Sequence, residues 1–174
     1  MAAFTTGNRL IVSQLLNIKE EMSRCANTNT FSIMARAFRE TPDNVYNLAP
    51  NHIFVFGSNL LGRHGNGEAK KALRFGAKWG VGIGMKGKTY ALPIRGLSLE
   101  RLSLNTISEH VANFGAFAEK YDDLVFLVSE IGCGPDEYTP EEIAPLFAAC
   151  ATLPNVFLPA RFWQSIFNNA ESHG

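Results

Sequence analysis

Two loops between predicted strands and helices combine glycine with polar side chains, a pattern that can hold a phosphate group. The first, GSNLLGRHGNG, covers residues 57–67, between the apolar run IFVF and a helix pattern. The second, EIGCGPDEY, covers residues 130–138 and follows the apolar run LVFLVS. Glycine lets backbone N–H groups approach a ligand without an intervening Cβ, and it permits positive φ. A helix N-terminus adds partly positive N–H groups, so the first loop suits an anion such as a diphosphate.

Both glycine loops, and the shorter loop IRGLS at residues 94–98, leave the carboxyl ends of predicted strands. In an open α/β sheet, ligands lie beyond these ends. For either loop alone, the alternative is that its glycines only turn the chain. Two such loops at one expected sheet edge favour a ligand between them.

Neither glycine pattern is a standard nucleotide motif. The stretch 57–64 has the glycine spacing of a P-loop, but Arg63 stands at its lysine position and His64 at its Ser/Thr position. The stretch 82–87 fits GxGxxG, but it follows a predicted helix and precedes a predicted strand. That order is the reverse of the one the dinucleotide motif requires.

The chain nevertheless resembles a known family. It carries N-L-x-G-x-x-G-x-G-x-A-K from Asn59, then YALPI on a predicted strand and IGCG on a late loop. This combination, from about residue 52 to 160, resembles macro domains, and most closely the macro-domain-like proteins of phages and bacteria. A more remote resemblance is to the small macro-domain branch that removes ADP-ribose from glutamate side chains. The resemblance implies a three-layer α/β/α fold with a mixed sheet, and binding of an ADP-ribose-type or cyclic nucleotide.

The resemblance also implies roles for individual residues. Asn59 would bind the ribose nearest the reacting end, residues 65–67 would face that ribose and the diphosphate, and residues 131–135 would wrap the phosphates. Asp136 matches the residue that performs acid/base chemistry in the glutamate-directed hydrolases. The expected ligand-binding set is Gly57, Ser58, Asn59, Gly62, Arg63, His64, Gly65, Asn66, Gly67, Arg95, Glu130, Ile131, Gly132, Cys133, Gly134 and Pro135.

The catalytic lysine of those hydrolases falls on Arg95 here, at the end of the middle predicted strand. A lysine amine can lose its proton and attack a sugar carbon, whereas a guanidinium stays charged and cannot. Arg95 can still pair with a phosphate or a carboxylate. The sequence therefore favours binding over turnover, and hydrolysis through water activated by Asp136 stays open.

Several candidates also have a purely structural interpretation. Asp136 can shape a turn after a proline, and Glu130 can be an exposed carboxylate instead of a partner for an adenine amine or a ribose hydroxyl. Cys133 is expected to pack under a tight loop rather than act as a nucleophile. For His64 we favour solvent over ligand contact, and for Trp79 helix packing over base stacking.

Composition limits the class of protein. The chain has 174 residues, 46% of them hydrophobic, which fits one globular domain with a full core and an appended segment. Lys plus Arg and Asp plus Glu are both 16, so the zero net charge disfavours general nucleic-acid binding. No apolar run is long enough for a membrane span, and no signal peptide is recognised.

Cysteine usage points to the compartment. Three widely spaced cysteines without a CxxC or Cys/His pattern predict no metal site, and we expect no cofactor. A reducing cytoplasm is the simplest location, or the host cytoplasm if a phage encodes the protein.

Apolar periodicity divides the chain into a helical extension, residues 1–50, and a main domain, residues 51–174. In the domain we expect strands starting at residue 53 and covering 88–94, 124–129 and 155–158. We expect helices over residues 68–79, 98–121, 139–151 and 159–168. The first predicted helix carries one apolar stripe, formed by Ile11, Leu15, Ile18 and Met22, which could pack on the same chain or form a homodimer.

Three functions stay open at this stage. The first is binding of an ADP-ribose-type or cyclic nucleotide, with sequestration of a nucleotide signal as one use. The second is hydrolysis of ADP-ribose derivatives with Asp136 as the acid/base. The third is a protein-interaction module with a relic pocket and functional N-terminal helices.

Overall fold

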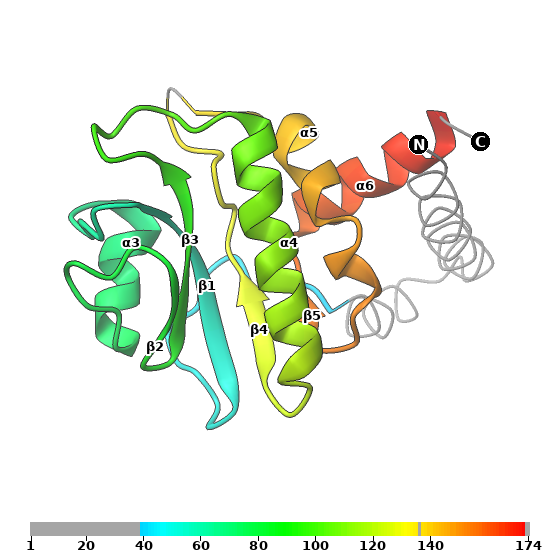
Figure 1. Ribbon diagram of the computed structural model, residues 1–174. Coiled ribbons are helices and arrows are strands. Elements are labelled where there is room, and N and C mark those ends of the chain that lie inside the picture. The colour runs from blue at the N-terminus through cyan, green and yellow to red at the C-terminus, as the bar shows by residue number, and fades with distance from the viewer. Residues whose placement is uncertain (1–38, 136, 173–174) are drawn as a thin grey trace.

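The computed structural model describes residues 39–135 and 137–172, which form a five-stranded sheet with the order β2-β3-β1-β4-β5 (Figure 1). Strands β1, β3, β4 and β5 are parallel, and β2 pairs antiparallel with β3. Their bounds are β1 His52–Asn59, β2 Gly84–Lys86, β3 Thr89–Arg95, β4 Val125–Val128 and β5 Val156–Phe157. Strand β1 therefore lies at the centre, with parallel neighbours on both sides.

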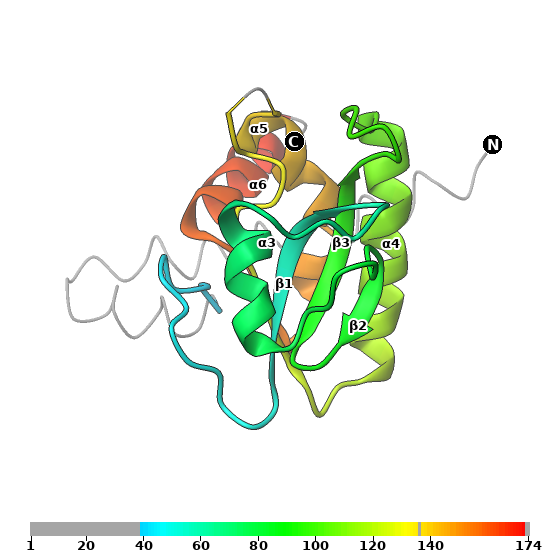
Figure 2. The ribbon, with the colours of Figure 1, turned by 90° about the vertical axis from the view of Figure 1, so that its left-hand side faces the viewer.

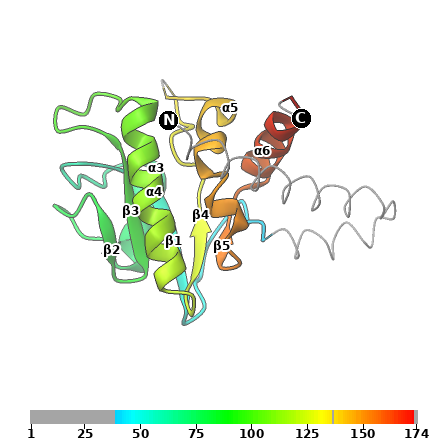
Figure 3. The same cartoon turned by 45° about the vertical axis from the view of Figure 1, so that its right-hand side comes forward.

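Helices cover both faces of this sheet. Helix α3, Gly67–Ala72, and helix α4, Leu104–Lys120, lie on opposite faces (Figure 2). Helices α5, Pro140–Ile143, and α6, Ala160–Ser172, contribute to the same core as α4. Helix α6 lies at the β5 side of the sheet, far from β2 (Figure 3). The expected α/β class with a mixed sheet is confirmed, and the arrangement is compatible with three α/β/α layers.

The strands are apolar along their length because successive side chains enter two different cores. On β1, Ile53 and Val55 face the α4 core, whereas Phe54 and Phe56 face the α3 core. A sheet buried on both faces needs apolar residues at nearly every position, which explains the absence of polar alternation.

Two predicted elements differ from the structure. The helix expected over 68–79 consists of α3 and one 3-10 turn, Leu73–Phe75, and it ends at Gly76 with φ 104°. A Cβ at Gly76 would lie 3.0 Å from the Cα of Gly87, so the chain turns away there, and Trp79 is 61% exposed instead of packed in a helix. Strand β2, which the sequence did not predict, follows this turn. Helix α4 is also shorter than expected, because it starts after the N-cap Ser103.

The helix start at Thr139 is confirmed. Thr139 and Glu142 form the expected capping box, in which the Thr139 N–H donates to the Glu142 carboxylate at 2.9 Å, and Pro140 opens α5. After α5 the chain continues in the 3-10 turns Ala144–Phe147 and Cys150–Thr152 instead of one long helix.

The outer edge of β5 is covered by residues 39–41. The Thr41 N–H donates to the Leu158 carbonyl at 2.9 Å, and the Leu158 N–H donates to the Arg39 carbonyl at 3.0 Å. The Arg39 guanidinium binds the carbonyls of Ala151 and Leu153 at 2.7 and 2.8 Å. The chain from residue 39 to 50 thus contacts the domain. The rest of the predicted extension, with its helices and the homodimer expected from them, lies outside the described residues.

Of the helices that the structure describes, none combines the length and apolar character needed to cross a membrane.

Candidate functional site

The carboxyl ends of β3, β1 and β4 meet at one edge of the sheet. Asn59 at the end of β1 is paired with Arg95 at the end of β3, and Val55 of β1 is paired with Val128 of β4. The Ser129 N–H donates to the Val55 carbonyl at 2.9 Å, which continues the ladder beyond β4. The three loops singled out from the sequence therefore lie at the same edge, as expected.

In the first glycine loop, polar side chains bind the chain itself. The Ser58 hydroxyl is buried and donates to the Gly82 carbonyl at 2.5 Å. The Asn59 side chain donates to the Arg63 carbonyl at 2.7 Å and accepts from the Arg63 N–H at 3.0 Å. Ser58, which we expected to contact a ligand, instead holds the loop against the segment that follows α3.

The glycines of this loop answer a packing requirement. Gly62 has φ 65°, and a Cβ there would overlap the Val81 backbone nitrogen. A Cβ at Gly82 would in turn overlap the Asn59 carbonyl oxygen. Backbone therefore packs directly on backbone between residues 59–62 and 80–82, which only glycine permits. The expected ligand role of Gly62 is corrected accordingly.

His64 is fully buried, so our preference for a solvent-exposed side chain is wrong. Its Nε2 lies 3.1 Å from the carbonyl oxygens of Lys78 and Val81, and its ring packs edge-on against Phe56 at 5.2 Å. Burial between two carbonyls also removes His64 from ligand contact. It connects the first loop to the turn before β2.

The second glycine loop is folded around Gly132, which has φ 74° and accepts from the Tyr138 N–H at 2.9 Å. Ile131 is buried, and Cys133 is half-buried with its Sγ 3.6 Å from the Ile131 carbonyl oxygen. Burial, followed by the charge of Glu130, raises the pKa of Cys133 to about 12. The thiol is therefore protonated at neutral pH, which agrees with a packing role and not with a nucleophile.

Arg95, at the end of β3, is engaged within the chain. Its Nε donates to Glu137 Oε1 at 3.1 Å, and its Nη1 donates to the Leu99 carbonyl at 3.1 Å. Glu137 Oε2 accepts from the Gly134 N–H at 3.2 Å. Asp136, the proposed acid/base, lies outside the described residues.

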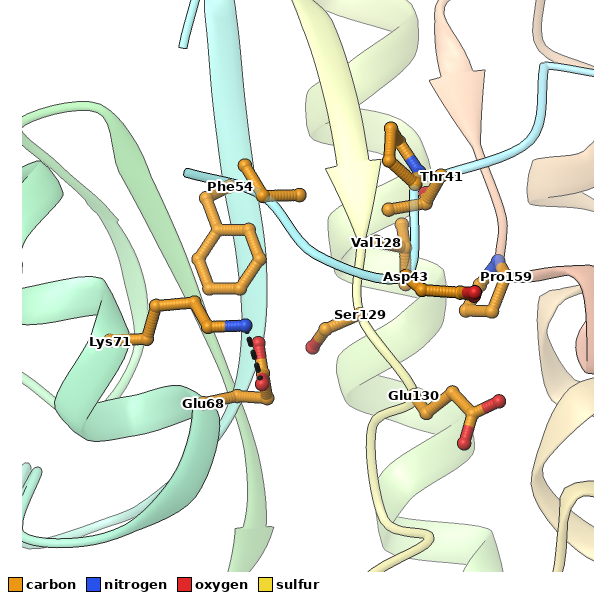
Figure 4. Close-up of a pocket in the computed structure, with 11 residues that line it drawn as sticks. Thr41, Asp43, Phe54, Glu68, Lys71, Val128, Ser129, Glu130 and Pro159 are labelled. Carbon is orange, nitrogen blue, oxygen red and sulfur yellow. Dashed lines mark hydrogen bonds and ion pairs between the residues drawn. The ribbon is translucent and has the colours of Figure 1, made fainter. Parts of the chain in front are cut away.

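A pocket of about 280 Å³ opens beside this edge, between α3, the end of β4 and residues 41–45 (Figure 4). Phe54, Val128 and Pro159 contribute apolar walls. In Figure 4 the Ser129 hydroxyl points from the β4 side toward α3, which carries Glu68 and Lys71. The full lining is Thr41, Pro42, Asp43, Val45, Phe54, Glu68, Lys71, Val128, Ser129, Glu130 and Pro159.

Two hydroxyl groups in this lining are buried without a hydrogen-bond partner among residues 39–135 and 137–172. They are Thr41 Oγ1 and Ser129 Oγ, on residues that are 4% and 7% exposed. A buried polar atom left unpaired costs about 1–3 kcal/mol. Buried polar groups of this kind are commonly satisfied by an ordered water or by a ligand.

The charged groups of the pocket are mostly hydrogen-bond acceptors. Glu68 pairs with Lys71 at 2.9 Å, and Glu130 pairs with Arg161 at 3.1 Å. Asp43 adds a third carboxylate, against the single ammonium group of Lys71. The interior therefore suits a group that donates hydrogen bonds, and it disfavours a bare phosphate. The Lys71 side chain is only 22% exposed and forms part of the wall.

Of the expected ligand-binding set, only Glu130 lines this pocket. Gly57 packs against Ile94 and Ile131, where a Cβ would lie 3.2 and 3.5 Å from their side chains. Residues 65–67, 134 and 135 are exposed in the two loops at this edge.

The sequence reading missed the pocket residues Thr41, Asp43, Glu68, Lys71 and Ser129. Ser129 directly follows an apolar strand, so it could have been found by considering every polar residue at the carboxyl end of a strand. Nothing local marks Thr41 and Asp43, because they reach the pocket through the long-range pairing at β5. Within residues 39–135 and 137–172, no group of three His, Cys, Asp or Glu side chains is placed to hold a metal ion.

Comparisons of the chain with protein-family models, curated proteins and solved structures found no match.

Proposed function

We propose that this protein binds an ADP-ribose-type or cyclic nucleotide at the carboxyl edge of its sheet, with the nucleoside part of the ligand in the pocket. The observation that carries the proposal is the pair of buried, unpartnered hydroxyls of Thr41 and Ser129 in one pocket. Ligands bind at this edge of parallel α/β sheets as a rule. The macro-domain resemblance of the sequence adds the nucleotide class.

The pocket matches a nucleoside in chemistry. Phe54, Val45 and Pro159 offer apolar surface to a flat ring or to the carbon face of a ribose. Carboxylates and hydroxyls accept hydrogen bonds from ribose hydroxyls or an exocyclic amine, and Glu130 is placed for this role. A volume of about 280 Å³ is near the lower end of small-molecule sites, roughly 300–1,000 Å³. It holds one such group, so the phosphates would lie outside, along residues 131–135.

Binding without turnover follows from Arg95. The position of the lysine nucleophile holds a guanidinium that is paired with Glu137. A guanidinium does not lose its proton near neutral pH and therefore does not attack a sugar carbon. Capture of a nucleotide signal is the use that fits such a site.

A thermal-shift screen against ADP-ribose, cyclic ADP-ribose isomers and cyclic dinucleotides tests the proposal. A ligand at about 100 times its dissociation constant stabilises the fold by roughly 2.7 kcal/mol. The double change Thr41→Val with Ser129→Ala should abolish this stabilisation while leaving the fold intact. Ser165→Ala is the matched control, because Ser165 Oγ is also buried and unpartnered but does not line the pocket.

Two results would count against the proposal. One is the absence of a shift with every nucleotide, and the other is an equal loss of the shift in the Ser165 variant. Analysis of the ligand recovered after denaturation separates capture from catalysis. Intact nucleotide supports capture, whereas cleaved nucleotide would indicate a hydrolase.

A further inference from the structure

The Glu137 carboxylate occupies a position built for an anion. One of its oxygens accepts from Arg95 Nε at 3.1 Å and the other accepts from the Gly134 N–H at 3.2 Å. The Glu137 side chain is only 16% exposed, so this is not a loose surface pair. A second cation, Arg101, donates to the Glu137 carbonyl at 3.2 Å and lies 4.4 Å from the Tyr138 ring centroid.

A guanidinium combined with a backbone N–H from a glycine loop is a common way to hold a phosphate oxygen. Arg95 ends β3, next to the end of β1, and Gly134 belongs to the loop that leads away from the pocket. The macro-domain resemblance implies phosphate contacts from residues 131–135, and Arg95 can pair with a phosphate or a carboxylate. In the structure, Arg95 and the Gly134 N–H both donate to one anion, which is a side chain of the same protein.

We propose that Glu137 masks a phosphate-binding site, and that a phosphate of the nucleotide displaces its carboxylate from Arg95 and Gly134. This inference rests on the proposed function and adds a determinant of specificity to it. Glu130 in the pocket and Gly134 are four residues apart, so they lie within about 14 Å of each other. A single nucleotide can therefore occupy the pocket with its nucleoside and the Glu137 position with a phosphate.

The mask has a consequence for selectivity. A free phosphate or pyrophosphate must compete with a carboxylate that is tethered to the site and is always present at high effective concentration. The phosphate of a nucleotide whose nucleoside is held in the pocket is also tethered to the site, so it competes with the carboxylate at a similarly high effective concentration. Glu137 thus discriminates against free inorganic anions and favours ligands that join a nucleoside to a phosphate.

Titration with inorganic pyrophosphate, followed by calorimetry at fixed ionic strength, tests the inference on the full chain. Glu137→Ala should bind pyrophosphate tighter than the wild type by a factor on the order of ten, since a charge-assisted hydrogen bond no longer has to be broken. Arg95→Gln in the alanine background should remove this gain. Glu137→Gln removes the charge and keeps one acceptor oxygen, so it retains only one of the two hydrogen bonds, and it should show a smaller gain in the same direction.

Glu142→Ala is the matched control. It removes the same charge and also a hydrogen bond from a carboxylate to a backbone N–H, but its partner is Thr139 and not an arginine. An equal gain in this variant would reduce the effect to net charge and overturn the proposal. Absence of any gain in both Glu137 variants, with circular dichroism showing that they are folded, would overturn it as well.

Titration with adenosine separates this inference from the proposed function. Adenosine has no phosphate, so Glu137→Ala should leave its affinity unchanged. A gain for pyrophosphate without any adenosine binding would refute the nucleoside pocket and retain the masked anion site. Adenosine binding without a gain in pyrophosphate affinity would support the nucleoside pocket and refute the masked anion site.

Discussion

The two glycine-rich loops look alike in the sequence but differ in what surrounds them. In the first, Ser58 donates to Gly82 and the Nε2 of His64 lies between two carbonyls, while the buried Nδ1 of His64 has no partner among the described residues. Beside the second, Ser129 has a buried hydroxyl without a partner, and it lines a pocket. Glycine content alone therefore does not distinguish the two loops. They differ in that the unpartnered Ser129 hydroxyl lines a pocket, whereas His64 does not.

The largest expected effect comes from Gly62, where a side chain would collide with the backbone at Val81. Gly62→Ala should reduce the free energy of unfolding by about 3 kcal/mol or more in urea denaturation. Gly67 is the matched control, because its φ of 51° is equally unfavourable for alanine but nothing lies within 4 Å. Gly67→Ala should cost only about 1–2 kcal/mol, which is the conformational part. Equal costs would show that the first loop is not closely packed.

Replacing His64 should have the next largest effect. His64→Leu leaves the carbonyls of Lys78 and Val81 without this donor, and it should cost about 2 kcal/mol in the same measurement. His110, a partly exposed residue of α4, serves as the control, and His110→Leu should cost clearly less than His64→Leu. If His64→Leu leaves the free energy of unfolding unchanged, the result would argue against the buried position of His64.

A pair of serine variants compares the two loops directly. Ser58→Ala removes a buried hydrogen bond to Gly82 and should cost about 1 kcal/mol. Ser129→Ala removes a hydroxyl that has no partner, so the stability of the free protein should stay the same or rise slightly. Chemical denaturation without ligand measures both. A larger loss for Ser129 than for Ser58 would reverse the comparison.

The smallest perturbation is a chemical probe of Cys133. With a pKa of about 12, only about one Cys133 thiol in ten thousand is a thiolate at pH 8. Alkylation by iodoacetamide, followed by mass spectrometry of the Cys133 peptide, should be far slower in the folded protein than in urea. Because the pKa is raised, the rate should rise about tenfold per pH unit and should still be rising at pH 10, where an unperturbed thiol would have levelled off. Rapid labelling at pH 8 would contradict the packing role of Cys133.

Much of the fold could be predicted because it depends on local pattern. The apolar runs fixed the positions of β1, β3, β4 and β5, and the residues around Thr139 and Pro140 indicated the start of α5. Strand β2 was missed because it has only three residues and its Met85 is exposed, so it shows no apolar pattern. The predicted helix from residue 68 was too long because its end depends on the close approach of Gly76 and Gly87.

The site was harder to predict because its residues come together through long-range contacts. Glu130 was found because it follows a strand, at the edge where ligands bind. The burial of His64 depends on carbonyls 14 and 17 residues further on, which no local pattern indicates. Whether Arg95 faces a ligand or an internal carboxylate is decided by Glu137, 42 residues away.

The attachment of residues 39–41 along β5 also has a consequence for protein synthesis. Arg39 bonds to residues that are translated more than 100 residues later. Its guanidinium binds the carbonyls of Ala151 and Leu153, and Leu153 is 114 residues further along the chain. Its own carbonyl accepts from the N–H of Leu158. A ribosome adds about 5–20 residues per second, so this delay lasts roughly 6–20 s. During that time the nascent chain carries Thr41 but cannot complete the cavity, since Pro159 has not yet emerged. The pocket lining is therefore complete only after residue 159 has left the ribosome.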